Sequence, residues 1–217
     1  LSIGMSIAKR LDGSKLKKED VQFLVQDCKQ QILKNYSNYE IVHIIINNYK
    51  IDNIEYTFLP DNIICNLVSL DILFICIPKE TIEYFKNFFL KINISVNKVF
   101  CSSYAKFFNY KDNFPSKKFL SLIDIGFNKT SIIHYNNNKI ISFNVFAIGG
   151  NHITKDLSKI LNIDFFNAEK IKLNFSGNQD VSNTKEYQSD LIESIIVARI
   201  EEILKLCQHS LKLNYNL

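Results

Sequence analysis

The chain has 217 residues, of which 47% are apolar and 22% charged, and its formal net charge is +4. Such a chain can bury a core, so we expect a globular protein with one large domain or two small ones. The small net charge and the lack of an arginine-rich stripe argue against nucleic-acid binding. No apolar run reaches the roughly 18 residues that a membrane-spanning helix needs.

The cysteines point to a reducing compartment. They are odd in number, far apart and free of any CxxC or Cys/His cluster, so neither a disulfide framework nor a zinc site is expected. The first residues, LSIGMSIAKRLDG, contain no signal-peptide core. The five cysteines are Cys28, Cys65, Cys76, Cys101 and Cys207.

The first part of the chain is predicted to alternate helices and strands. Apolar side chains at helical spacing predict a helix over 15–35, and Asp20 favours its start. β-branched runs predict strands over 41–51 and 71–77, the second of which is ended by Pro78. The apolar face of the helix consists of Val21, Leu24, Val25, Cys28 and Ile32.

An amphipathic helix is predicted over 79–92, followed by a short strand over 95–100 and a helix over 102–110. This order gives an α+β module. The polar, proline-containing segment 112–118 is predicted to be a linker that divides the chain into two parts. The apolar stripe of the first of these helices is Ile82, Phe85, Phe88, Phe89 and Ile92.

The chain as a whole is predicted to be α/β to α+β, in two parts divided near residue 118, and the second part follows the linker. A meander of three strands is followed by two helices, a loop over 176–190 and a long amphipathic helix over 191–213. Acidic residues on the polar face of the long helix disfavour anionic lipids, so its apolar face is predicted to pack in the core rather than on a membrane. That face consists of Leu191, Ile195, Ile196, Ile200, Ile203, Leu204 and Leu211. The strands are predicted over 119–125, 130–135 and 139–147, and the two helices over 151–161 and 166–175.

The stretch Asp124-Ile125-Gly126 ends a strand just before a tight turn. Backbone N–H groups in such a turn can receive phosphate oxygens, and the aspartate can hold a water of a bound Mg²⁺. A plain hairpin, in which Asp and Gly serve only the turn, is the alternative.

A second glycine pair, Gly149-Gly150, precedes the helix predicted over 151–161, and helix N-termini favour anions. An ordinary strand-to-helix turn is the alternative for this pair. Glu169 and Lys172 lie three residues apart on the next helix, where they could bracket a ribose and a base or form a solvated ion pair.

These segments together resemble the FtsA family of cell-division proteins, within the actin/Hsp70-type ATPase superfamily. The Asp-Ile-Gly hairpin is followed by IGGNHITKDL, AEKIK and VARIEEILKL in the order typical of that family. The matching positions are Gly149, Gly150, Thr154, Asp156, Leu157, Ala168, Glu169, Ile171 and Lys172.

The first part of the chain resembles the family's own small subdomain, called 1C, through His43, Tyr49, Ile51 and Asp52. The resemblance therefore implies an α/β, actin-like ATPase fold with ribonuclease H-like lobes and an FtsA-type 1C subdomain, incomplete at both ends. It implies subdomain 1C over 1–97, the return of subdomain 1A and a linker over 98–118, subdomain 2A strands over 119–150, a 2B-like part over 151–188 and a 2A helix over 189–217.

The same resemblance implies ATP and Mg²⁺ as cofactors, with Asp124 on the metal side. It implies that the amides of Gly126, Phe127 and Asn128 face the β- and γ-phosphates, and that Glu169 and Lys172 approach the ribose and adenine. The implied site residues are Asp124, Gly126, Phe127, Asn128, Lys129, Thr130, Gly149, Gly150, Glu169 and Lys172.

One motif departs from the family pattern, because the expected Gly-Gly-Gly-Thr reads Gly126-Phe127-Asn128-Lys129 here. No residue fills a water-activating role, so ATP binding without efficient hydrolysis is expected. Two explanations stay open for the altered motif and for a fold that is incomplete at both ends. The chain is an internal piece of a longer FtsA, or it is a divergent paralogue.

The resemblance also implies partners and a location. They are the C-terminal peptide of the tubulin-like FtsZ at 2B, self-association into filaments, and later division proteins at 1C, with no nucleic acid. The location is the inner face of the cytoplasmic membrane at the division site, reached through a C-terminal membrane helix that this sequence lacks. An actin-like pilus-assembly scaffold of the PilM type is the alternative function, and a sugar kinase or Hsp70-like enzyme is a third.

Overall fold

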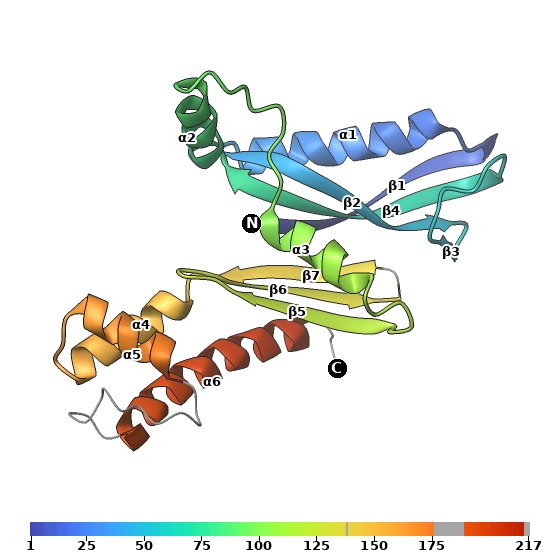
Figure 1. Ribbon diagram of the computed structural model, residues 1–217. Coiled ribbons are helices and arrows are strands. Elements are labelled where there is room, and N and C mark those ends of the chain that lie inside the picture. The colour runs from blue at the N-terminus through green and yellow to red at the C-terminus, as the bar shows by residue number, and fades with distance from the viewer. Residues whose placement is uncertain (138, 176–188, 215–217) are drawn as a thin grey trace. The chain divides into compact units, whose positions relative to one another are not determined.

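The computed structural model describes residues 1–137, 139–175 and 189–214. The chain forms two compact units. The first contains residues 1–120 and 134–141, and the second contains 121–133 and the described residues from 142 onward. Each unit has its own core of buried side chains. Figure 1 shows the helices and strands of both units.

The first unit is built on an antiparallel sheet with the strand order β1-β4-β2-β3. The helix α1 (Lys18–Asn35) lies along one face of this sheet (Figure 1). Alternate residues of β4 point toward α1, as the twofold period of a strand requires, and they form the main core. The strands are β1 (Ser2–Lys15), β2 (Tyr39–Ile51), β3 (Ile54–Tyr56) and β4 (Ile64–Pro78), and the β4 core residues are Val68, Leu70, Ile72, Phe74 and Cys76.

The predicted helix over 15–35 and the strands over 41–51 and 71–77 are confirmed as α1, β2 and β4. Of the predicted apolar face, Val25 is half-buried and the other four residues are buried. The strand β1 was not predicted, although Ile3, Met5 and Ile7 alternate with small residues as a half-buried strand requires, so its period-two signal was present in the sequence.

The predicted stripe of α2 (Lys79–Leu90) is wrong in large part. Only Ile82 of that stripe is buried, whereas Phe85, Phe88 and Ile92 are about half exposed. The reason is that α1 already covers the sheet face, so α2 reaches the sheet mainly through β4 and through the ion pair of Lys86 with Glu40 on β2. The strand predicted over 95–100 is also wrong, because this segment forms no regular structure.

The helix α3 (Ser102–Lys111) confirms the helix predicted over 102–110. His43 on β2 fixes its start, because His43 Nε2 accepts the Cys101 N–H at 2.9 Å. Burial, with a contribution from Lys98, lowers the pKa of His43, and this keeps the imidazole neutral and able to accept.

The meander after the linker is confirmed as β5 (Phe119–Ile125), β6 (Thr130–Asn136) and β7 (Lys139–Phe146), in the order β5-β6-β7. The central strand β6 is buried along almost its whole length, whereas β5 exposes Ile123 and Ile125. The tight turn between β5 and β6 belongs to the second unit.

Three helices complete the second unit: α4 (Gly150–Ile160), α5 (Phe165–Asn174) and α6 (Ser189–Asn214). The first half of α6 packs on α4 and α5, and its second half packs on the sheet through Ile203 and Cys207. Core packing is confirmed for Ile195, Ile196 and Ile203, but Leu191, Ile200 and Leu204 of the predicted face are exposed.

None of the helices within the described residues is long and apolar enough to cross a membrane. The predicted loop 176–190 falls outside the described residues except for its last two, which belong to α6. The predicted 2B-like part is described as far as residue 175.

Candidate functional site

The turn between β5 and β6 docks against the N-terminus of α4. The Gly126 N–H donates to the Lys129 carbonyl at 2.9 Å, which closes the turn. The Gly126 carbonyl accepts the Gly150 N–H at 2.9 Å, and the Phe127 carbonyl accepts the Asn151 N–H at 2.7 Å. The turn at Gly126 and the glycine pair Gly149-Gly150, here called the two glycine corners, are therefore joined by backbone hydrogen bonds.

Gly149 makes this close approach possible. A Cβ on Gly149 would lie 2.3 Å from the Gly126 carbonyl oxygen and 2.8 Å from that of Phe127, far inside van der Waals contact. Its φ of −168° is extended backbone that any residue adopts, so the requirement for glycine is steric alone. Gly150 has no such constraint, because the nearest atom to its added Cβ is Lys172 Nζ at 3.7 Å.

The directions of the turn carbonyls fix the directions of its amides. In a planar trans peptide the C=O and the following N–H point in opposite directions, and the part of the chain that the structure describes contains no cis peptide bond. Because the carbonyls of Gly126 and Phe127 both point at α4, the N–H groups of Phe127 and Asn128 point away from it. Two successive amides directed to one side of an exposed turn are a backbone arrangement that receives anions.

Phe127 and Asn128 stand where the FtsA pattern has glycines, but neither residue has a positive φ. The turn therefore does not need glycine for its conformation at these two positions. The Asn128 side chain adds a contact of its own, because Asn128 Oδ1 accepts a hydrogen bond from Asn151 Nδ2 at 2.7 Å.

Two further predicted site residues lie beside the turn. Asp124 is half-buried near the end of β5. Thr130 is fully buried, and its hydroxyl donates to the Ile148 carbonyl at 2.7 Å, so this side chain holds β6 to the segment before Gly149. Lys129 lies exposed in the turn itself.

Glu169 and Lys172 on α5 form a network with α4. Lys172 Nζ lies 2.7 Å from Glu169 Oε2, 2.8 Å from Thr154 Oγ1 and 3.2 Å from the Gly150 carbonyl oxygen. Thr154 also contacts the Glu169 carboxylate through its hydroxyl. The hydrogen bonds from Lys172 first, and from Thr154 second, lower the pKa of Glu169, so its carboxylate is ionised at neutral pH.

Sequence reasoning did not place Asn151 and Arg199 at this site. Asn151 is 8% exposed, and its Oδ1 is buried without a hydrogen-bond partner among the described residues. Arg199 on α6 braces α4, because its Nε donates to Asp156 Oδ2 at 2.7 Å while its Nη1 contacts Glu202. Both Asp156 and Arg199 lie inside the motifs that carry the FtsA resemblance, which is the signal that could have found them.

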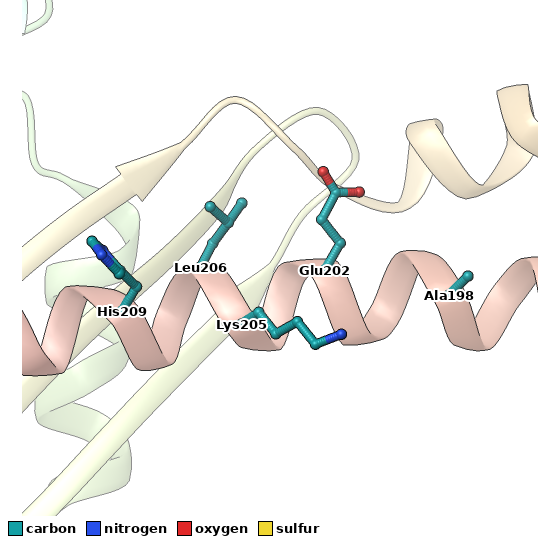
Figure 2. Close-up of a pocket in the computed structure, with 5 residues that line it drawn as sticks. All are labelled: Ala198, Glu202, Lys205, Leu206 and His209. Carbon is teal, nitrogen blue, oxygen red and sulfur yellow. The ribbon is translucent and has the colours of Figure 1, made fainter.

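A shallow hollow along α6 is a weaker candidate. Figure 2 shows its five lining residues in a row on one helix, with Lys205 lying along the helix. The hollow has an apolar floor and no convergent set of polar groups, so it offers no chemistry of its own. The lining residues are Ala198, Glu202, Lys205, Leu206 and His209.

Comparison with known proteins now adds to this geometry. The sequence model of the family described as cell division protein FtsA matches residues 121–216, the segment that carries the joined corners and the helices behind them. The cell division protein FtsA of Buchnera aphidicola subsp. Baizongia pistaciae is 25% identical over 216 residues, which are 90% of this chain and 49% of that protein. This chain is thus similar to FtsA proteins over most of its length.

The FtsA of Bacillus subtilis is 31% identical over 108 residues, which are 43% of this chain and 24% of that protein. The chain spans about half the length of the curated relatives that it matches across most of its own length. The predicted resemblance to FtsA is thus confirmed.

The fold is supported by a solved structure, the PilM-PilN type IV pilus biogenesis complex. It matches with a TM-score of 0.66 at 13% identity and covers 98% of this chain and 55% of that chain. Together with the FtsA match, this likeness confirms the predicted α/β, actin-like ATPase fold.

The residues present fit a nucleotide phosphate in part. The amides of Phe127 and Asn128 point away from α4 on an exposed turn, whereas the amides of Gly126, Gly150 and Asn151 are already used within the chain. The unpartnered Asn151 Oδ1 could accept from a metal-bound water or a hydroxyl. The described residues contain no group of three or more metal-ligating side chains, and a Mg²⁺ held by one carboxylate, waters and phosphate needs none.

Proposed function

We propose that this chain acts in cell division as an FtsA-like scaffold that binds nucleotide, links FtsZ filaments to the inner face of the cytoplasmic membrane and recruits later division proteins. The observation that carries the proposal is the similarity to FtsA proteins over nine-tenths of the chain. The FtsA sequence model supports it further, because its match includes the turn, α4, α5 and α6.

The proposal assigns parts of the fold to FtsA subdomains. The first 97 residues correspond to 1C, 98–118 to the return into 1A with its linker, and 119–150 to the 2A strands. The remaining segments, 151–188 and 189–217, correspond to a 2B-like part and a 2A helix. Under this assignment the FtsZ C-terminal peptide binds the 2B-like part and later division proteins meet 1C.

The nucleotide is proposed to be ATP with Mg²⁺. The N–H groups of Phe127 and Asn128 would hold phosphate oxygens, and Lys129 would add positive charge beside them. Asp124 would hold a water of the metal, and Mg²⁺ would neutralise phosphate charge there. Glu169 and Lys172 would face the ribose and adenine. To do so they would have to replace some of their hydrogen bonds to Thr154 and Gly150 with hydrogen bonds to the nucleotide.

Nucleotide binding is testable by titrating the chain with a fluorescent ATP analogue in the presence and absence of Mg²⁺. Asp124→Asn is expected to remove the Mg²⁺-dependent part of the affinity, whereas Asp112→Asn, an exposed acid of the linker, should leave it unchanged. Equal affinity of the two variants, or no binding by the unaltered chain, would argue against the proposed nucleotide site.

A PilM-like pilus-assembly scaffold is the second candidate function, because the PilM-PilN complex matches 98% of the chain in fold. Anisotropy of labelled peptides separates the two. Binding of the FtsZ C-terminal peptide, without binding of a peptide from PilN, supports the FtsA-like function. The reverse pattern would establish the PilM-like scaffold instead.

A further inference from the structure

The strand β2 has an open edge over most of its length. The short strand β3 pairs only with Tyr49, Lys50 and Ile51, so it fills one end of the position beside β2. From Tyr39 to Ile46, no backbone segment of the described chain pairs with this outer edge, whereas the Asn47 side chain bonds both the N–H and the carbonyl of Ile140. An open edge presents unpaired N–H and C=O groups to which an extended chain can add as a further strand.

A groove runs beside this open edge, between β2 and α1, and its floor is apolar. Tyr39, Ile41 and Ile44 line it from β2, and Leu33 lines it from α1. A register shift between Ile41 and His43 brings Ile41 and Ile44 to the same side of the strand, toward α1. Leu33 is 45% and Ile44 37% exposed, so the groove has apolar surface that an added strand would cover.

The rim of the groove is basic. Lys29 from α1, Lys79 from the start of α2 and Lys98 from the following segment all line it. The one carboxylate on the lining, Glu40, already has a cation of its own, because Lys86 Nζ lies 3.8 Å from Glu40 Oε1. The groove therefore presents an excess of positive charge around an apolar floor.

We propose that this groove binds an extended, acidic segment of a partner protein, which adds as a strand to the open edge of β2. The backbone of the segment would pair with β2, its alternate apolar side chains would cover Ile44 and Leu33, and its carboxylates would meet the three lysines. The proposal concerns the first unit only, so it does not depend on nucleotide or FtsZ binding by the second.

A second copy of the chain fits this groove less well than an acidic segment. Among the described strands, the longest free edge that a second copy could offer is that of β1, and this strand carries Lys9, Arg10 and Lys15. Placing these cations against the groove lysines would bring like charges together. Self-association is accordingly an outcome of the test and not its expected result.

The first experiment measures fluorescence anisotropy of a labelled peptide of about ten residues that alternates Glu with Val or Thr, added to the full chain. Two control peptides separate the contributions. One replaces each Glu with Lys, and the other keeps the side chains but N-methylates alternate amides, which blocks strand pairing. Binding of the unmethylated acidic peptide alone, weakened by added salt, is the expected result. Equal binding of either control, or no binding of the acidic peptide, overturns the proposal.

The second experiment locates the site with charge reversals on exposed side chains, which leave the core intact. The double variant Lys29→Glu, Lys98→Glu is expected to bind the acidic peptide about tenfold more weakly, since each exposed pair contributes modestly. Its matched control, Lys117→Glu with Lys155→Glu, carries the same charge change away from the groove and should bind as the unaltered chain does. Equal affinity of the two double variants overturns the assignment to this groove. Analytical ultracentrifugation tests self-association. If the unaltered chain sediments as a dimer and the Lys29→Glu, Lys98→Glu variant as a monomer, a second copy binds the groove and the proposal of an acidic segment is overturned.

Discussion

The sheet of the first unit and the joined corners of the second are specified in different ways. The sheet depends on the repeated burial of side chains such as Phe74 and Leu70, each of which is replaceable by a residue of similar size. The corners depend on backbone atoms that meet at Gly149, where no side chain fits. One region is thus set by a pattern over many residues, and the other by a single position.

The largest expected effect tests the first region. Phe74→Ala should lower the free energy of unfolding of the first unit by about 3–5 kcal/mol, because Phe74 is fully buried against α1 and the sheet. Urea unfolding followed by circular dichroism measures this change. Phe58→Ala removes the same group from a side chain that is 83% exposed and should cost well under 1 kcal/mol. Similar losses in both variants would mean that the core described here does not hold the sheet.

The next effect tests the second region. Gly149→Ala should cost about 2–4 kcal/mol, because the new methyl group must displace the carbonyls of Gly126 and Phe127 and with them two backbone hydrogen bonds. Gly150→Ala is the matched control, since its methyl group meets only the flexible end of Lys172. Thermal unfolding of both variants checks the difference. If they unfold alike, the turn and α4 are not in the close contact that the structure shows.

The same contrast explains how far the sequence predicted the fold. Periodicity found α1, β2, β4 and every element from β5 to α6, because a buried face repeats with the period of its helix or strand. It predicted the helix α2 but not the exposure of its apolar stripe. Periodicity shows that one face is apolar, but it cannot show that α1 covers the sheet face on which this stripe would pack. The strand β1 was missed although its apolar residues Ile3, Met5 and Ile7 also repeat with the period of a strand.

The candidate site was predictable only where a motif marked it. Gly149, Gly150, Glu169 and Lys172 were identified through the FtsA pattern, and the structure brings Gly150, Glu169 and Lys172 into one network. The hydrogen bonds of Lys172 to Thr154 and to the Gly150 carbonyl depend on three-dimensional distances. The sequence alone does not contain these distances. The pairing of Asn128 with Asn151 joins residues far apart in the chain and has no sequence signature.

A smaller effect is expected where a side chain, and not the backbone, joins two elements of the second unit. Arg199→Gln should cost about 1 kcal/mol, because it removes the ion pair with Asp156 that ties α6 to α4, and both side chains are partly open to solvent. Arg10→Gln, an exposed change on β1, serves as the control and should be neutral within error. Urea unfolding at low and high salt checks both, since screening should shrink only the Arg199 effect. A loss for Arg199→Gln that salt does not change would point to packing of its stem instead of the ion pair.

The smallest expected effect tests whether the charge of Glu169 stabilises the contact between α4 and α5. The pKa of Glu169 is lowered by its hydrogen bonds from Lys172 and Thr154, so its charged form favours the folded state. A lowered folded pKa contributes stability above the ordinary Glu value of 4.5, and this stability is lost as the pH falls through the folded pKa. Glu169→Gln should therefore be about 0.5–1 kcal/mol less stable than the unaltered chain at neutral pH, and this gap should close as the pH falls through the lowered pKa of Glu169.

Glu201→Gln is the matched control for this pH profile. Glu201 also faces a lysine, Lys205 at 3.3 Å, but both side chains are more than half exposed. Its substitution should leave stability nearly unchanged at either pH, because exposed pairs on a helix contribute little. A gap for Glu169→Gln that persists undiminished at low pH would show that shape and hydrogen bonding, and not charge, hold α5 against the glycine corner.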